Sequence, residues 1–489
     1  MDSNNDYRYV FRHEQKDQPP QNPEPKKPSG EWRCPVSLLL GLLCCAVVAT
    51  MLFTYAMTAA WTRKETSEQL LLQQQQIAAL QAALEEGSEF DKLNYLAALF
   101  EQFSYYSNKF DKDEMLNEVL RAYSIATGDA YADYYTPEEY EQLKSDNEGT
   151  GVGIGISVVQ TPLTFNGYQY QTFHVIAIFK NAPAEGSGIR VGDYVYAVKV
   201  DGTYMTVAGM GGYTNALNAF RGEEGTTVEF LALRSDGNGG YTEHSFSVTR
   251  GAFVKESVSY KKAENDPTVG IIHISEFDLN TPTQLKEAVR ALQADGAEHF
   301  VFDVRNNPGG DLQSIKAVLT YFLEKGDLIL SAIDNKGNVA ASYVAEKMNL
   351  VGEYAKCNVS EEEIGMFADL DMVVLCNENT ASAAEVFTAS LRDHKNVTIV
   401  GKTTYGKGIM QQFFNLSAMT YGAYDGYVKM TTYAYVTECG ETYHDVGIAP
   451  GEGYEVALSD EAQQYNFYFL PQALDDQLQK ALTVFQNQN

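Results

Sequence analysis

The strongest constraint on this fold is a run near the N-terminus, Cys34–Thr62, that contains no charged residue. Its central part, Leu38–Ala60, is long enough to cross a hydrocarbon layer of ~30 Å as a helix. We therefore expect a transmembrane anchor over 34–62, preceded by a disordered cytoplasmic tail over 1–33 that is polar and rich in proline. A buried core helix and a signal peptide cleaved after Ala60 are the alternatives, and the long polar tail favours the uncleaved anchor.

Residues 63–88 predict a helical stalk, because Leu70, Ile77 and Leu84 are spaced by seven. A short coiled coil that joins two copies as a homodimer is one interpretation. A single amphipathic helix that packs on the next domain is the other, and two heptads do not decide between them. Basic residues flank both ends of the anchor, so its orientation follows from the function expected downstream, which is extracytoplasmic.

Net charge excludes one class of partner. The chain has 489 residues and a formal net charge of −29, so nucleic-acid phosphates would repel it and we expect no nucleic-acid partner. Six cysteines occur without the spacing of a zinc site. A disulfide such as Cys357–Cys439 is compatible with an extracytoplasmic location, but the pattern does not establish it.

The remainder of the chain predicts a multidomain α/β protein. Residues 89–148 form an N-terminal helical region by their periodicity. Within it, Thr136, Pro137 and Glu139 form the signature of a capped helix start.

Residues 149–250 are rich in glycine and β-formers, with a turn signal at Asp201-Gly202, which indicates a small, mostly β domain. Residues 251–457 alternate strands and helices, which is typical of an α/β core, and 458–489 predict a C-terminal helical region. The expected core elements are strands at Val269–Ile274, His299–Val304, Met372–Cys376 and Val397–Val400 and helices at Thr281–Asp295, Leu312–Lys325 and Ser382–His394.

A serine stands where the strand expected at Met372–Cys376 gives way to a helix. Backbone N–H groups at the helix start can stabilise negative charge beside the Ser382 hydroxyl. The same place suits an ordinary N-cap, which is the more frequent role of a serine there. Small neighbours such as Ala383 leave room for a substrate and favour a nucleophile.

Lys407 lies between Gly406 and Gly408, a pattern that also fits a solvated hairpin tip. As a general base this lysine must be buried, since its ordinary pKa of ~10.4 has to fall by roughly 2–3 units. Gln411 shares a face with Lys407 in either a helix or a strand, which places it to orient the amine.

The segment Asp303–Gly310 follows the strand expected at His299–Val304 and ends in Pro-Gly-Gly. Two glycines permit a tight turn whose N–H groups point outward. Such a turn suits an oxyanion hole formed by Gly309 and Gly310 together with the Ala383 N–H. A plain strand-to-helix turn is the alternative.

Taken in order, these segments resemble those of the C-terminal processing peptidases, also called tail-specific proteases. The resemblance covers roughly Leu93 to the C-terminus. The matching segments are Asp129–Glu139, Gly151–Ile156, Ala182–Asp193, Arg221–Gly225, Asp303–Gly310, Thr380–Glu385 and Gly406–Gly408. The separation of 25 residues (407 − 382) between Ser382 and Lys407 is also usual in that family.

The resemblance implies a Ser–Lys dyad on an α/β core related to the crotonase-like spiral folds. Ser382 would be the nucleophile, Lys407 the general base and Gln411 the residue that orients the lysine; no metal and no cofactor is implied. Glu385 matches an acidic position near the site, and a structural helix residue is an equal alternative. Ala384 stands where serine is frequent, which indicates a divergent member whose specificity is open.

The resemblance also implies that 149–250 is a PDZ domain, which binds the C-terminal tails of protein or peptide substrates by strand addition. The residues expected to hold the terminal carboxylate are Gly153, Ile154, Gly155 and Ile156. A glycine-rich turn is the alternative for this segment. Arg221 matches an arginine that couples ligand binding to gating of the active site, with a surface salt bridge as its alternative.

Two functions are compatible with these patterns. The first is a membrane-anchored serine endopeptidase that recognises substrate tails. The second is a catalytically silent, PDZ-bearing peptide-binding or scaffold protein at the membrane. The joint presence of Ser382, Lys407 and the Gly309-Gly310 turn favours the enzyme, because a silent relative would not need all three.

Overall fold

The computed structural model describes residues 91–440 and 442–486, and it divides into two compact units with the boundary after Ser107. In the first unit the described part contains helix α2 (Asp91–Phe103). The tail, anchor and stalk expected over 1–88 lie outside the described residues. Among the helices that the structure does describe, none is long and apolar enough to cross a membrane.

The second unit opens with two helices and a short strand: α3 (Lys112–Ala126), β1 (Asp133–Tyr135) and α4 (Pro137–Asn147). The helix start predicted for α4 is confirmed. The Glu139 carboxylate accepts a hydrogen bond from Thr136 N at 2.9 Å, and Thr136 Oγ1 accepts one from Glu139 N at 3.3 Å. This reciprocal pair satisfies two N–H groups that the helix itself leaves without acceptors.

An antiparallel sheet of order β3-β4-β5-β7-β8, with β6 beside β5, lies in the range from which the sequence predicts a β domain. Its elements are β3 (Ile156–Phe165), β4 (Tyr168–Ile178), β5 (Tyr194–Val200), β6 (Thr203–Thr206), α5 (Tyr213–Asn218), β7 (Thr227–Ser235) and β8 (Tyr241–Thr249). The turn expected at Asp201-Gly202 joins β5 to β6, with φ of 49° and 79°. Two positive φ values are what a tight hairpin turn of this twist requires. Where the chain enters and leaves this domain, β2 (Thr150–Gly153) pairs with β9 (Gly251–Val254).

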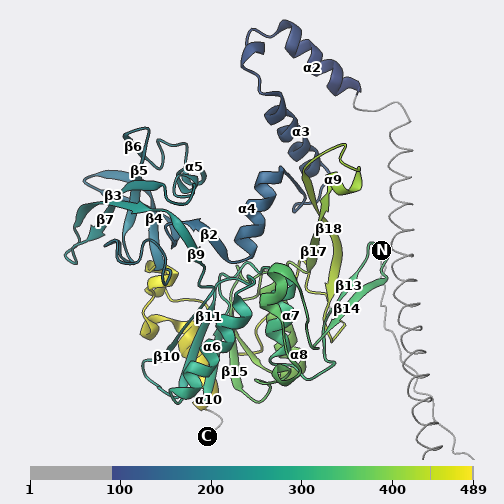
Figure 1. The fold of residues 1–489 in the computed structure, drawn as a ribbon. Helices are drawn as coiled ribbons and strands as arrows, with labels where there is room; N and C mark the ends of the chain where they lie inside the picture. The colour runs from purple at the N-terminus through teal and green to yellow at the C-terminus, as the bar shows by residue number, and fades with distance from the viewer. Residues whose placement is uncertain (1–90, 441, 487–489) are drawn as a thin grey trace, which may run out of the picture. The chain divides into compact units, whose positions relative to one another are not determined.

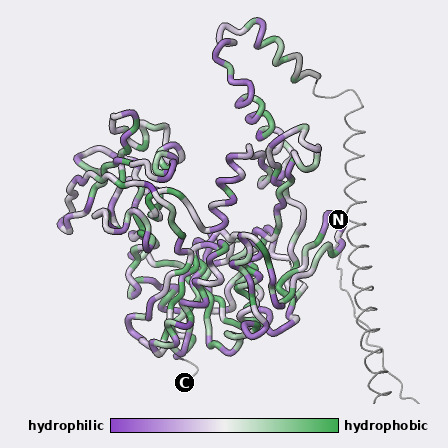
Figure 2. The backbone as a smooth tube through the Cα atoms, in the orientation of Figure 1, coloured by the Kyte–Doolittle hydropathy of each residue, from purple (hydrophilic) through white to green (hydrophobic). Residues whose placement is uncertain are grey.

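The central sheet has the order β10-β11-β12-β15-β16, parallel except for β10. Its elements are β10 (Val258–Lys262), β11 (Val269–Ile274), α6 (Thr281–Ala294), β12 (His299–Asp303), α7 (Leu312–Thr320), β15 (Asp371–Cys376), α8 (Ala383–Lys395), β16 (Thr398–Gly401) and α10 (Asp476–Gln486). Strand side chains alternate between the two faces. Ile272 and Phe302 pack with α6, α7 and α8, whereas Val301 and Leu375 pack with α10. Figure 1 shows these four helices in the lower part of the picture, together with β10, β11 and β15. In Figure 2, which has the orientation of Figure 1, many hydrophobic (green) segments run through the lower part of the tube, where Figure 1 labels the strands of this sheet.

A third sheet, which the sequence did not predict, has the order β1-β18-β13-β14 with β17 beside β18. Its remaining strands are β13 (Leu328–Ile333), β14 (Val339–Val344), β17 (Ile409–Asn415) and β18 (Tyr427–Val436). The shorter helices are η1 (Ser107–Lys109), η2 (Gly352–Cys357), η3 (Glu361–Glu363), α9 (Leu416–Met419), η4 (Ala462–Gln464), η5 (Phe467–Phe469) and η6 (Gln472–Leu474). Strand β1 pairs Tyr134 with Val428, so the segment before the β domain lies alongside β18.

The elements predicted for the central sheet agree with the structure to within one residue at each end, with one exception. The helix expected over Leu312–Lys325 ends at Thr320. There the chain turns so that Tyr321, Phe322 and Leu323 all enter the core, a tertiary preference that overrides helical propensity.

The structure answers a question that the sequence left open about the cysteines. Cys357 and Cys376 are buried free thiols, so the described residues contain no Cys357–Cys439 disulfide.

Candidate active site

Ser382 occupies the sharp turn between β15 and α8. Its φ is 55° and its ψ is −119°, a conformation that an L-residue adopts only under constraint from its surroundings. The constraint comes from the preceding loop, where Thr380 Oγ1 donates to Val304 O (2.8 Å) and Ala381 N donates to Asn307 O (2.9 Å). The serine is thereby fixed against the carboxyl end of β12.

Glu385, one turn into α8, joins the serine segment to the lysine segment. Its fully buried carboxylate accepts hydrogen bonds through Oε2 from Ser382 N and Lys407 N, each at 2.8 Å. Its Oε1 accepts from Thr404 Oγ1 at 2.6 Å and from Gly406 N at 2.7 Å. One side chain therefore holds together two segments that lie far apart in the sequence.

Ser382 and Lys407 line one cavity of about 580 Å³. Ala383, Gly310 and Gln411 line the same cavity. The structure thus brings into one space most of the residues that the sequence indicated as catalytic or as oxyanion donors.

Lys407 is partly buried, and its Nζ lies 4.4 Å from the centre of the Tyr131 ring. Burial lowers the pKa of the Lys407 amine and the positive charge of Lys429 lowers it further, while Glu385 and Asp129 oppose both effects. A lowered pKa makes the neutral amine more available, which is what a lysine needs to act as a base near neutrality.

Tyr435 on β18 lines the same cavity as Ser382. Burial raises the pKa of Tyr435 to about 12, and the Ser382 hydroxyl offsets part of that rise. The phenol therefore stays protonated at neutral pH.

The Pro-Gly-Gly turn packs directly against the serine. Gly309 has a φ of 105°, and a Cβ there would lie 2.7 Å from Ser382 Cβ. The Gly309 N–H donates to Asn307 Oδ1 at 2.8 Å, so in this conformation it is not available as an oxyanion donor, which corrects the prediction for Gly309. The N–H groups of Gly310 and Ala383 have no acceptor within the described part of the chain, so both can serve a substrate.

Gln411 lies on β17, and its Nε2 donates to Thr431 Oγ1 on β18 at 3.1 Å. Thr431 in turn donates from its N and its Oγ1 to the Asp129 carboxylate, at 2.7 and 3.0 Å. Gln411 shares the cavity with Lys407, but no hydrogen bond joins these two side chains in the described structure.

A second groove, of about 250 Å³, lies in the β domain. Its lining includes Gly153, Ile154, Gly155 and Ile156 together with Phe173, Phe220 and Phe253. Gly155 has a φ of 72°, and a Cβ there would lie 2.2 Å from Ala182 Cβ, so this loop requires a glycine. Arg221 also lines the groove and forms an ion pair with Asp146 of α4 at 3.3 Å.

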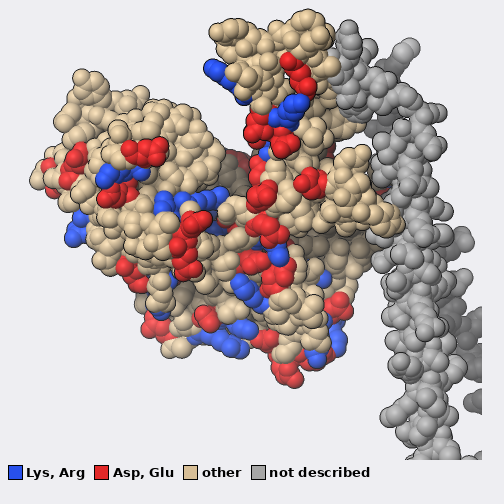
Figure 3. Space-filling model, turned by 45° about the horizontal axis from the view of Figure 1, so that its top comes forward, with Lys and Arg blue, Asp and Glu red and all other residues tan. Residues whose placement is uncertain are grey.

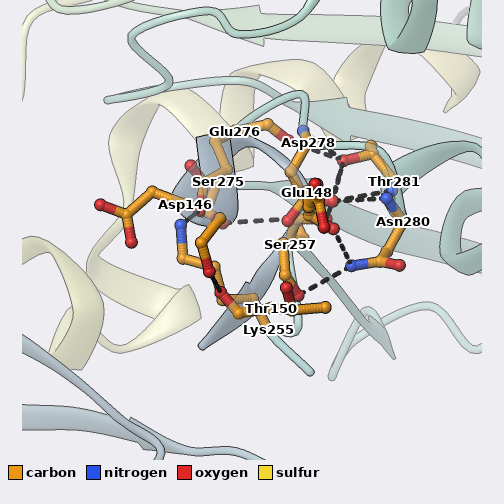
Figure 4. A network of polar contacts seen from close by, with 12 residues as sticks. Asp146, Glu148, Thr150, Lys255, Ser257, Ser275, Glu276, Asp278, Asn280 and Thr281 are labelled. Carbon is orange, nitrogen blue, oxygen red and sulfur yellow. Dashed lines mark hydrogen bonds and ion pairs between the residues drawn. The ribbon is translucent and has the colours of Figure 1, made fainter. Parts of the chain in front are cut away.

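A polar network ties the β domain to the central sheet (Figure 4). Asp278 Oδ1 accepts hydrogen bonds from Asn280 N (2.7 Å) and Thr281 N (3.1 Å). The Asn280 side chain donates to the carbonyls of Glu148 (3.0 Å) and Gly149 (2.8 Å), just before β2. The network therefore holds the chain where it enters the β domain.

The charges around the active-site cavity do not favour a substrate of one particular charge. On the face shown in Figure 3, acidic and basic side chains are interspersed. The charged side chains that line the cavity are Lys144, Lys407 and Lys429 with Glu148, Asp311 and Glu353. Both signs of charge are therefore present where a substrate would lie.

Similarity to known proteins identifies the family. Peptidase family S41 matches residues 268–452. The carboxy-terminal processing protease CtpA of Bacillus subtilis is 30% identical over 365 residues, which are 74% of this chain and 68% of that protein. The chain belongs to the C-terminal processing peptidases of family S41.

Two further comparisons give the extent of the similarity. A probable CtpA-like serine protease of Staphylococcus haemolyticus is 31% identical over 323 residues, which are 66% of this chain and 56% of that protein. A solved structure of a putative S41 protease from Bacteroides fragilis has a TM-score of 0.51 at 16% identity, covering 81% of this chain and 97% of that one. This second similarity concerns the fold alone.

Three residues of this S41 site were missed by the sequence analysis in their present roles: Asp129, Tyr131 and Tyr435. The first two lie in a segment that the sequence did single out, Asp129–Glu139, but only as a family resemblance. Tyr435 belongs to a strand with many tyrosines and threonines, and that composition was the available signal for β18.

Proposed function

We propose that this chain is a membrane-anchored serine endopeptidase of the C-terminal processing type, with Ser382 and Lys407 as its catalytic dyad. One observation carries the proposal. The Glu385 carboxylate binds the backbone N–H of Ser382 and of Lys407 at 2.8 Å each, while both of those side chains line one cavity.

The proposed chemistry uses only groups of this cavity. Ser382 Oγ attacks the scissile carbonyl carbon while the neutral amine of Lys407 takes the hydroxyl proton. The N–H groups of Gly310 and Ala383 donate to the oxyanion that forms. As the C–N bond breaks, Lys407 returns the proton to the leaving amine, and an acyl-enzyme remains. A water then attacks the ester, Lys407 takes its proton and passes it to Ser382 Oγ, and the new C-terminus leaves.

Recognition of substrate tails is assigned to the β domain as a PDZ domain. Strand β3 is at the edge of its sheet, so a peptide can add to it as a further strand. Ile154 and Ile156 supply an apolar place for the terminal side chain. Arg221 is suited to coupling, because it lines the groove and is also ion-paired with Asp146 outside the domain.

The location belongs to the same proposal. The uncharged run over 34–62 supports a single-pass anchor. Its orientation, with the catalytic part outside the cytoplasm, follows from the proposed activity. The spacing in 63–88 supports a homodimer through the stalk. The dyad itself requires neither a metal nor a cofactor.

The test uses the full-length chain in detergent micelles with an unfolded protein as substrate. We expect cleavage by the unaltered chain, and none by Ser382→Ala or Lys407→Ala. Lys402→Ala is the control, because Lys402 pairs with Glu455 and does not line the cavity. Equal cleavage by the first two variants would exclude this dyad. Binding of tail peptides without cleavage by the unaltered chain would replace the enzyme with the scaffold function.

A further inference from the structure

The loop before β1 is hydrogen-bonded to β18, a strand that lines the active-site cavity. The Asp129 carboxylate accepts three hydrogen bonds: from Thr431 N at 2.7 Å, from Thr431 Oγ1 at 3.0 Å and from Tyr131 N at 2.9 Å. These contacts fix the backbone of Tyr131 relative to β18. The segment 129–131 is therefore part of the active-site wall, although it precedes the β domain in the chain.

Tyr131 lies directly over the lysine. Its ring centre lies 4.4 Å from Lys407 Nζ. Burial, and then the phenol of Tyr405, raise the pKa of Tyr131 to about 12, so the ring stays neutral at the pH of the reaction. A neutral ring over the amine excludes water from that side.

Two effects of the ring on the amine oppose each other. Exclusion of water disfavours the ammonium form, whereas the π face attracts it by about 0.5–1 kcal/mol at an exposed site. Burial is the larger influence on the Lys407 pKa here, with further contributions from Lys429 on β18, Glu385 on α8 and Asp129. The net effect of covering the amine is therefore to favour its neutral form.

We propose that Tyr131 is a positioning residue for Lys407: its ring covers the amine and holds it toward the cavity that contains Ser382. The inference rests on the proposed function of the dyad. It assigns the segment before the β domain a role at the active site. Tyr131 acts through the lysine and transfers no proton itself.

The test compares Tyr131→Ala and Tyr131→Phe in the full-length chain, with Tyr168→Ala, an exposed tyrosine of the β domain, as the matched control. We expect Tyr131→Ala to lower kcat about 10- to 100-fold, since a displacement of a catalytic group by ~1 Å costs about 100-fold. The rise of kcat/KM with pH should move to higher pH, because water reaches the amine. Tyr131→Phe keeps the ring and should restore most of the rate.

A second measurement does not depend on activity. Reductive methylation of Lys407 by formaldehyde, followed by mass spectrometry across a pH series, reports the protonation of the amine directly. In Tyr131→Ala we expect the labelling midpoint at higher pH than in the unaltered chain. Thermal unfolding curves of both proteins establish that each is folded under the labelling conditions. If Tyr131→Ala is too unstable, Tyr131→Leu, which lacks the ring but keeps apolar volume, should show a shift in the same direction.

The outcomes separate the two proposals. Unchanged kcat and labelling midpoint in Tyr131→Ala, a midpoint at lower pH, or a Tyr131→Phe variant as poor as Tyr131→Ala would each overturn the role of the ring. Failure of the unaltered chain to cleave in a Ser382-dependent way would instead overturn the dyad. In that case the labelling midpoints still decide whether Tyr131 covers the amine.

Discussion

At the scale of single residues, the active site depends on a carboxylate that takes no part in the proposed chemistry. Glu385 is fully buried, and its two oxygens accept four hydrogen bonds. The donors are the backbone N–H groups of Ser382, Gly406 and Lys407 and the hydroxyl of Thr404. A buried carboxylate is costly unless hydrogen bonds satisfy it, and here four do. The hydrogen bonds of this side chain join α8 to the loop before β17.

Replacement of this carboxylate should therefore separate the dyad. In Glu385→Gln one oxygen becomes an NH₂ group, which faces two donors and cannot accept from them. We expect a loss of about 2–4 kcal/mol in the free energy of unfolding, since each buried donor left without an acceptor costs ~1–3 kcal/mol. We also expect kcat to fall at least about 100-fold, because the dyad is displaced. Urea denaturation and peptide cleavage measure the two effects, and exposed Glu378→Gln is the control. Near-normal kcat in Glu385→Gln would contradict this role.

A second residue-scale prediction concerns the second cation of the cavity. Lys429 lowers the pKa of Lys407, after the larger effect of burial. Removal of its charge in Lys429→Met should raise the Lys407 pKa, so the ascending limb of kcat/KM moves to higher pH. The displacement should be on the order of 0.5 pH unit, the size expected for a partly solvated charge pair. Lys402→Met is the control, and a limb that stays in place or moves to lower pH in Lys429→Met would show that Lys429 does not influence the base.

At the scale of elements, the sequence predicted the central sheet well and the third sheet not at all. β11, β12, β15 and β16 are short apolar runs bounded by turn residues, a pattern that is read locally. The third sheet joins strands from three distant segments, those of β1, of β13 and β14, and of β17 and β18, and its strands are only partly buried. Pairing between strands so far apart in the chain produces no periodic pattern of hydrophobic residues in a single sequence, so the sequence does not predict which strands pair.

The candidate site shows the same division between local and long-range information. Ser382, Lys407 and Gly310 stand in short motifs, so they were found from the sequence. The bond between Glu385 and Lys407 N and the bond between Asp129 and Thr431 N depend on how distant segments meet. No spacing rule contains such contacts.

The element that covers the second face of the central sheet gives a further prediction. Arg305, in the turn before Gly309, is buried and binds Asp475 through two hydrogen bonds of 2.9 and 2.8 Å, next to the start of α10. Removal of one partner from a buried ion pair costs about 3–5 kcal/mol when the other charge is left unpaired. Arg305 keeps its two hydrogen bonds to Asp303, at 2.9 and 2.6 Å, so the cost here should lie at the lower end. We expect Asp475→Ala to lose stability of that order in urea, whereas exposed Asp460→Ala should lose little. If both variants unfold at the same urea concentration, α10 is not held by this pair.

At the scale of the whole molecule, the connection between the β domain and the central sheet contains a buried carboxyl group whose ionised form is destabilised by its surroundings. Asp278 is 2% exposed, and its Oδ2 has no hydrogen-bond partner in the described structure, although Oδ1 is well satisfied. A Cβ at Gly149 would lie 2.5 Å from that Oδ2, so the entering strand packs closely on it. Burial raises the pKa of Asp278 to about 6, with Glu276 adding to the rise and hydrogen bonds opposing it.

The direction of the resulting pH dependence follows from proton binding. Between the ordinary carboxyl pKa of 3.8 and about 6, the folded chain holds this proton more tightly than the unfolded chain. The free energy of unfolding due to Asp278 therefore falls as the pH rises through that window. Above pH 6 the full cost is present, and a rise from 3.8 to about 6 corresponds to about 3 kcal/mol.

Asp278→Asn removes the ionisation but keeps an oxygen that accepts from Asn280 N and Thr281 N. Relative to the unaltered chain, we expect this variant to gain up to about 3 kcal/mol at pH 7.5 and little or nothing at pH 4. Other groups titrate in the same range, so urea unfolding of both proteins is compared at each pH and the difference is taken. Glu264→Gln, which removes an exposed carboxylate near β10, should show no such difference. A gap between Asp278→Asn and the unaltered chain that stays constant from pH 4 to pH 7.5 would mean that the pKa of the Asp278 carboxyl is not raised by folding.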